Sequence, residues 1–128
     1  MPRPLAADRG AAAVEFALVA PLLLVVVLGI AEFGRAYDTK AALSQAAREG
    51  ARALAVGSTP AVARAAAHAA APQLVLADAN IAVTPSTCLG AAAGVNAKVD
   101  VTARFVFLTG LLGAPMTLTG TSTMRCQG

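Results

Sequence analysis

Residues 16–31 read FALVAPLLLVVVLGIA, a run of sixteen residues without a charged side chain. Extended back to Ala11, the run covers twenty-one residues and is interrupted only by Glu15. A helix of about 20 predominantly apolar residues is long enough to cross a bilayer. A buried helix of a soluble domain is the alternative, but the rest of this short chain is too small to cover a helix that is apolar on every side. The run therefore predicts a membrane-spanning helix.

The composition of the whole chain agrees with an anchor plus a very small domain. Of 128 residues, 57% are hydrophobic and 13% are charged, whereas soluble domains carry about 25% charged residues. The formal net charge of +3 is small and scattered, so we expect no nucleic-acid partner. Alanine accounts for 33 residues and supplies little core volume. Phe105 and Phe107 are the main large side chains that we expect in the core.

The helical pattern continues beyond the apolar run. No proline occurs over residues 32–56, and the segment GSTP at 57–60 ends the pattern. Small or apolar residues recur on one face of this helix, at Ala36, Leu43, Ala47, Gly50 and Leu54. We expect one helix over residues 11–56, with about half of its length in the bilayer and half outside.

After residue 57 the pattern changes to a short helix followed by strands. Thr59 or Ser58 can cap a helix over residues 60–71, which begins with a proline. Apolar runs and alternation predict strands over residues 80–84, 96–108 and 116–125. The fold class is therefore α+β: a long N-terminal helix with a transmembrane half, a short second helix and an antiparallel sheet of about three strands. The apolar connection over residues 108–115 either covers the edge of the core or touches the membrane or a partner.

The two cysteines can staple this small core. In an up-down-up sheet, Cys88 lies beyond the end of the first strand and Cys126 beyond the end of the third, on the same side. Strands two apart are separated by about 10 Å, and a disulfide requires Cα atoms within about 7 Å, but residues 85–88 give the slack to close that gap. We predict a Cys88–Cys126 disulfide, with free buried thiols as the alternative. Two cysteines alone do not make a metal site.

The segment GAAAVEF at residues 10–16 places a carboxylate at the edge of the span. Such a group is costly in a bilayer, by about 2.5–3.5 kcal/mol for Asp at a helix centre and less near the interface. If the chain were cut after Gly10, Ala11 would carry a positive α-amine and Glu15 would lie one helical turn away. In an assembly, the carboxylate of one subunit could then neutralise the amine of its neighbour. The alternative is that Glu15 is an interfacial acid, favoured by the helix dipole.

This arrangement resembles the processing site of type IV prepilins and pseudopilins. In those proteins a short basic leader ends in Gly, and a Glu at the fifth mature position precedes a hydrophobic helix. Residues 10–57 as a whole resemble the TadE-like family of the tight-adherence (Flp) pilus system. The matching pieces are AVEFA at 13–17, Pro21, EFGR at 32–35 and AAREGAR at 46–52.

The resemblance implies a pilin-like fold and a non-catalytic minor pilin or pseudopilin that takes part in assembly of a tight-adherence pilus. It implies cleavage between Gly10 and Ala11 by a prepilin peptidase, with Glu15 and Phe16 acting in assembly. The implied partners are membrane lipid, other pilins or pseudopilins, and the inner-membrane assembly platform. The implied location is the bacterial inner membrane, crossed once, with incorporation into the pilus as a further step. The N-terminus would be cytoplasmic, and the C-terminal domain would be periplasmic or extracellular.

The expected division of the chain follows from these features. A cytoplasmic leader covers residues 1–10, and a transmembrane helix covers residues 11–33. The helix continues in the periplasm over residues 34–57, and a small α+β periplasmic domain covers residues 58–128.

Two other functions are weaker interpretations of the same residues. An uncleaved, membrane-tethered accessory or binding protein of a secretion or pilus system would use the same anchor and sheet. An enzyme is not expected, because His68 is the single histidine and the sequence has no Ser/His/Asp set, Walker loop or metal cluster. We expect no cofactor and no metal. An ordinary secretory signal is disfavoured because the apolar run is long and no A-x-A site follows it.

Overall fold

The computed structural model describes the backbone of residues 5–127 and the side chains of residues 8–127. The first helix, α1, covers Leu5–Ala55. The chain divides into two compact units after Gly34, and each is described separately below. The expected helix started at Ala11, but the structure begins it at Leu5, because the segment LAADRG contains helix formers and a single glycine that costs only about 1 kcal/mol. Residues 1–4 of the expected leader lie outside the described residues.

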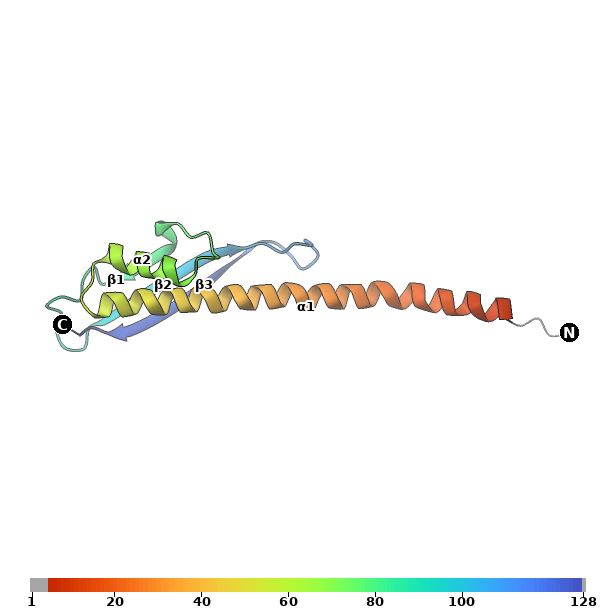
Figure 1. Cartoon of the computed structure of the whole chain (residues 1–128), viewed down its shortest axis with the longest axis horizontal. Coiled ribbons are helices and arrows are strands. Elements are labelled where there is room, and N and C mark those ends of the chain that lie inside the picture. The colour runs from red at the N-terminus through yellow and green to blue at the C-terminus, as the bar shows by residue number, and fades with distance from the viewer. Residues whose placement is uncertain (1–4, 128) are drawn as a thin grey trace. The chain divides into compact units, whose positions relative to one another are not determined.

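The second unit, from Arg35 onward, is a two-layer α+β domain, as the sequence predicts. After α1 come helix α2 (Pro60–Ala70), a 3-10 turn (Asp78–Asn80), and strands β1 (Ile81–Thr84), β2 (Asn96–Phe105) and β3 (Met116–Arg125). The three strands form an antiparallel sheet in the order β1-β2-β3. In this unit, α2 and the sheet lie beside the C-terminal part of α1 (Figure 1).

Strand β2 is shorter than the expected strand, which extended to Leu108. The last pair of the β2–β3 ladder is Phe105 with Met116. The residue before Met116 is Pro115, which has no N–H to donate to a further pair. Phe105 is buried, but Phe107, which was expected in the core, is only half-buried and packs edge-on against Phe105 with ring centroids 5.3 Å apart.

Strand β1 also begins one residue later than expected. Asn80 belongs to the 3-10 turn, where its side-chain oxygen accepts a hydrogen bond from the backbone N–H of Ala77 at 3.1 Å. This local bond competes with strand geometry, as short amide side chains often do.

One face of the sheet packs against both helices. The apolar residues of β2 alternate, so Ala97, Val99 and Val101 are buried while Lys98 on the other face is exposed. The core combines residues from α1, α2 and the sheet, and most of its helical members are alanines. The buried residues of this core are Ala42, Leu43, Ala46, Ala47, Ala51, Ala67, Ala71, Ile81, Val99 and Val101. The predicted helix stripe is therefore confirmed, except that Ala36 is only half-buried.

Two glycines allow the backbones to approach closely in this core. A Cβ atom on Gly120 of β3 would collide with the backbone of α1 at Leu43 and Ser44. A Cβ atom on Gly50 would lie 3.2 Å from both the Ala63 carbonyl oxygen and the Val99 side chain. Small residues at these points let the sheet and α2 approach α1 at the distance of backbone contact.

The end of α1 and the start of α2 are capped by local hydrogen bonds. Gly57 has a φ of 92°, its N–H bonds to the Leu54 carbonyl at 3.0 Å, and the Ser58 N–H bonds to the Ala53 carbonyl at 3.3 Å. This is the Schellman pattern, in which glycine accepts the left-handed conformation. At the start of α2, the Thr59 hydroxyl accepts from the Val62 N–H at 3.4 Å, so the predicted N-cap is confirmed.

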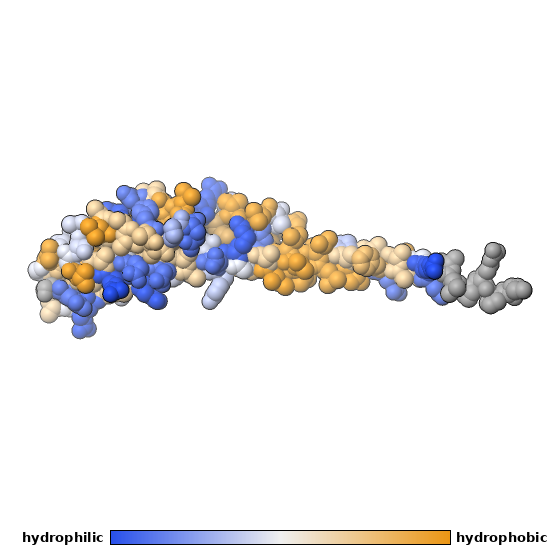
Figure 2. Space-filling model, viewed as in Figure 1, coloured by the Kyte–Doolittle hydropathy of each residue, from blue (hydrophilic) through white to orange (hydrophobic). Residues whose placement is uncertain are grey.

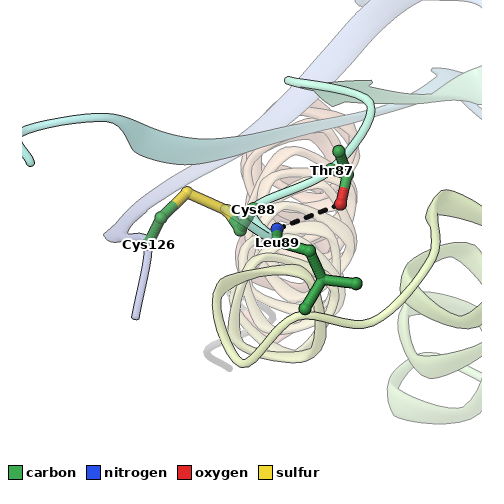
Figure 3. Close-up of a disulfide and its surroundings, with 4 residues drawn as sticks. All are labelled: Thr87, Cys88, Leu89 and Cys126. Carbon is green, nitrogen blue, oxygen red and sulfur yellow. Dashed lines mark hydrogen bonds between the residues drawn. A yellow bond between two sulfur atoms is a disulfide. The ribbon is translucent and has the colours of Figure 1, made fainter. Parts of the chain in front are cut away.

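A disulfide lies at the end of the domain near the C-terminal end of α1. Cys88 and Cys126 form a disulfide, with their Cα atoms 5.3 Å apart (Figure 3). As expected, Cys88 lies beyond the end of β1 and Cys126 beyond the end of β3. Nearby, the Leu89 N–H donates to the Thr87 hydroxyl at 3.0 Å. The Gln127 N–H donates to the Ala55 carbonyl at 2.9 Å, so the C-terminal segment also satisfies an acceptor at the end of α1.

Candidate anchoring and assembly segment

The apolar side chains of the first unit are exposed along α1. They include Phe16 at 73% exposure, Leu18 at 73% and Ile30 at 69%, and Figure 2 shows apolar side chains gathered along this part of the helix. By length and composition the helix is a candidate membrane span, with a mean hydropathy of 2.6 in its most apolar window and none of that window buried. Contiguous apolar surface of this extent marks a membrane or protein interaction site.

The expected cleavage and assembly residues all lie within α1. Gly10 and Ala11 are exposed and helical, and a Cβ atom on Gly10 would meet nothing within 4 Å. Glu15 and Phe16 are also exposed. Glu15 follows Ala11 by four residues, so the two lie on the same helix face. Ala11 and Glu15 are therefore exposed neighbours on one face of α1.

Pro21 lies inside α1 without ending it. A proline in a helix has no N–H, so the carbonyl of Ala17 is left without its usual helical donor. Neighbouring helices can satisfy such freed groups in a membrane. This position is consistent with a helix that packs against others, although it forms no site by itself.

Some charged residues have contacts that the sequence pattern did not predict. Glu32 is 2% exposed and interacts with other groups of the chain, although its motif gave no sign of burial. The Arg35 guanidinium lies 5.2 Å from the centre of the Phe105 ring, in a cation–π contact. The Lys40 ammonium donates to the Thr119 carbonyl. The last two contacts join residues far apart in sequence, so local periodicity carries no signal for them.

The remaining polar contacts lie on the surface of the second unit. The Nε2 of His68, the single histidine, lies 2.9 Å from a carboxylate oxygen of Asp78. Within residues 8–127, no group of three or more His, Cys, Asp or Glu side chains is placed to hold a metal ion.

Asp100 is held in its charged form by its neighbours on the exposed face of the sheet. The Thr121 hydroxyl donates to its carboxylate at 2.6 Å, and Lys98 lies 3.1 Å from the other carboxylate oxygen. The hydrogen bond from Thr121 is the main cause that lowers the pKa of Asp100 below 3.8, with a smaller contribution from Lys98 and an opposing one from burial. This cluster joins β2 to β3 through the Asp100–Thr121 hydrogen bond.

Comparison with known proteins bears on the N-terminal part of the chain. The model of a family described as TadE-like protein matches residues 10–52. No curated protein and no solved structure matches the chain significantly. The match begins at Gly10 and ends within α1, so it contains the apolar segment and the buried stripe except Leu54, but none of α2 or the sheet.

Proposed function

Residues 10–52 are TadE-like, and on this premise we propose that the protein is a minor pilin or pseudopilin of a tight-adherence pilus system. The observation that carries the proposal is the combination, within the matched segment, of Glu15 with an apolar helix whose side chains are exposed. An apolar helix of this length is at its lowest free energy in a bilayer or among other apolar helices. Both surroundings are provided during pilin assembly.

The proposed pathway begins with the chain anchored in the inner membrane and its N-terminus in the cytoplasm. A prepilin peptidase cuts between Gly10 and Ala11 and removes residues 1–10. Residues 11–33 then form the membrane span, residues 34–57 its periplasmic continuation, and residues 58–128 the periplasmic domain. In the structure the bond to be cut lies within helical residues, so we expect local unwinding at Gly10 before cleavage. Glycine makes this unwinding less costly than another residue would.

Glu15 supplies the proposed assembly contact. After cleavage, the amine of Ala11 and the carboxylate of Glu15 are opposite charges in a region of low dielectric. Pairing between neighbouring subunits would relieve the cost of holding either charge among apolar helices. Phe16, 73% exposed, would pack against neighbouring helices at the same level. The protein's role is structural, and its partners are other pilins or pseudopilins and the assembly platform.

The proposed cleavage is tested by substituting Gly10. In the native host, Gly10→Val is expected to leave the chain in the membrane at full length, because the added side chain occupies the residue at the cut. Gly29→Val is the matched control, since a Cβ atom at Gly29, as at Gly10, meets nothing within 4 Å. The readout is the size of the membrane-extracted chain. Normal processing of Gly10→Val would contradict the proposed site.

The proposed role of Glu15 is tested by Glu15→Gln, which keeps the shape of the side chain and removes its charge. We expect membrane insertion and cleavage to be unchanged. Incorporation into sheared pili or into assembly complexes should fall by about tenfold or more, equivalent to at least ~1.4 kcal/mol. Glu49→Gln is the control, because Glu49 belongs to the second unit. Normal incorporation of Glu15→Gln would remove the assembly role.

The second candidate is an uncleaved, membrane-tethered accessory protein of the same kind of system. It is favoured by the start of α1 at Leu5, because the helix already includes the expected cleavage site. In that case Glu15 is an interfacial acid near the beginning of a helix. A full-length chain in native membranes that still supports pilus assembly would favour this function over the first.

A further inference from the structure

The connector between β2 and β3 exposes large apolar side chains. Leu108 is 76% exposed, Leu111 71% and Leu112 40%, and Val106 is 53% exposed. No charged residue occurs from Phe105 to Met124. Single exposed leucines are ordinary. Four large apolar side chains within seven uncharged residues, however, form a patch of the kind that marks a membrane or protein interaction site.

The connector begins beside Arg35, the first residue of the second unit. Arg35 is four residues beyond Ala31, the last residue of that run, which is about 6 Å along a helix. The guanidinium of Arg35 lies 5.2 Å from the ring of Phe105, and the connector begins at the next residue. Both residues belong to the second unit, so this proximity holds for any orientation of the first unit.

Basic side chains lie at the same end of the second unit. Arg35 and Arg104 line an open depression of about 540 Å³ together with Leu74, Val106 and Leu108. Arginines beside exposed leucines are typical of surfaces that lie in the membrane interface, where the guanidinium meets lipid phosphates and the apolar side chains enter the acyl boundary. The charge of the depression therefore matches an anionic lipid headgroup.

We propose that residues 106–112 insert into the outer interface of the same bilayer that the N-terminal helix crosses. Leu108, Leu111 and Leu112 enter the acyl boundary, and Arg35 and Arg104 lie at the level of the phosphates. The second unit then rests on the membrane before assembly, instead of being held only by the helix. This inference rests on the proposed membrane anchor, and it adds a second contact that the family match does not cover.

The absence of tryptophan from the sequence allows a direct test. Each of three variants of the full chain carries one tryptophan and is placed in lipid nanodiscs that contain phosphatidylglycerol and brominated phosphatidylcholine. Leu111→Trp reports on the connector. Val25→Trp reports on the apolar run, where Val25 is 55% exposed. Val56→Trp is the control, because Val56 is 61% exposed and lies about 30 Å from Arg35 along α1.

Bromine quenches tryptophan only at short range, so the three variants separate the possible outcomes. We expect Leu111→Trp to be quenched several times more strongly than Val56→Trp and to emit at shorter wavelength. Quenching of Leu111→Trp no stronger than that of Val56→Trp would overturn the inference, and a blue-shifted but unquenched Leu111→Trp would mean that protein covers the connector. If Val25→Trp is also unquenched, the proposed anchor itself fails.

The role of the arginines is tested in the same nanodiscs. Replacing phosphatidylglycerol by phosphatidylcholine should reduce the quenching of Leu111→Trp and leave that of Val25→Trp unchanged, because only the first depends on anionic headgroups. Arg104→Gln should have the same effect as the lipid change. Quenching that is strong but unaffected by either change would contradict the proposed recognition of anionic headgroups by Arg35 and Arg104.

Discussion

Two sections of the single helix α1 follow opposite rules of burial. Over residues 16–31 the side chains are large and apolar, and almost all of them are exposed. Over residues 42–55 most apolar side chains are alanine, and the stripe that faces the sheet is buried. In a water-soluble helix the large side chains would be inside. The first section is thus a candidate membrane span by length and composition, whereas the second section supports a domain.

Two glycines of the second unit, Gly50 in α1 and Gly120 in β3, set how closely the domain packs. Gly120 and Gly50 bring backbone to backbone, so the sheet and α2 gain contact without large side chains. The core is correspondingly small, because alanine buries little apolar area.

The largest expected effect on the domain comes from its disulfide. Replacing both cysteines, as Cys88→Ala with Cys126→Ala, should lower the free energy of unfolding of the second unit by about 4 kcal/mol in the chain-entropy estimate for a separation of 38 residues. Hydrogen exchange of the detergent-solubilised chain measures this as lost protection over residues 81–125. Peptides from residues 16–31 should keep their protection. Equal loss of protection over residues 81–125 and over residues 16–31 would mean that the two units are not independently stabilised.

A glycine-to-alanine exchange should change stability in opposite directions in the two units. Gly120→Ala forces a Cβ atom into the α1 backbone at Leu43, and we expect it to destabilise the second unit by about 3 kcal/mol. Gly29→Ala has open space around its Cβ atom and should stabilise the helix by up to about 1 kcal/mol. Hydrogen exchange of each region provides the comparison. A neutral Gly120→Ala would show that the sheet can move away from α1 at little cost.

The smallest expected effect is electrostatic and confined to the second unit. Because the pKa of Asp100 is lowered on folding, its contribution is present above pH 3.8 and is lost as the pH falls through the lowered value. Thr121→Val removes the main cause, so the variant should lose less stability on acidification than the parent chain, by under about 1 kcal/mol for this partly exposed group. Denaturant unfolding at about pH 6 and about pH 3 tests this sign. An identical acid response of both chains would contradict it.

The sequence predicted the elements whose signals are local. The alternation of β3 placed that strand correctly at both ends, and the stripe from Leu43 to Leu54 identified the buried face of α1. The exceptions depend on tertiary partners. Strand β2 ends at Phe105 because Pro115 cannot pair, and the approach of Gly120 to α1 joins residues distant in sequence.

Only the part of the candidate site that is continuous in sequence was predicted. Gly10, Ala11, Glu15 and Phe16 are recognisable because their spacing carries the signal, and their placement on α1 adds exposure. The contact between Arg35 and Phe105 could not be predicted, since seventy residues separate the two in the chain. The roles of the four linear residues stay predictions.

We propose that the exposed section of α1 is a pilin-type anchor that matures by loss of its leader. The most direct test is the intact mass of the protein extracted from the membranes of its native host. We expect a chain that begins at Ala11 and lacks residues 1–10, with the Cys88–Cys126 bond intact. A chain that retains those ten residues would contradict maturation at Gly10 and would favour the uncleaved, tethered protein.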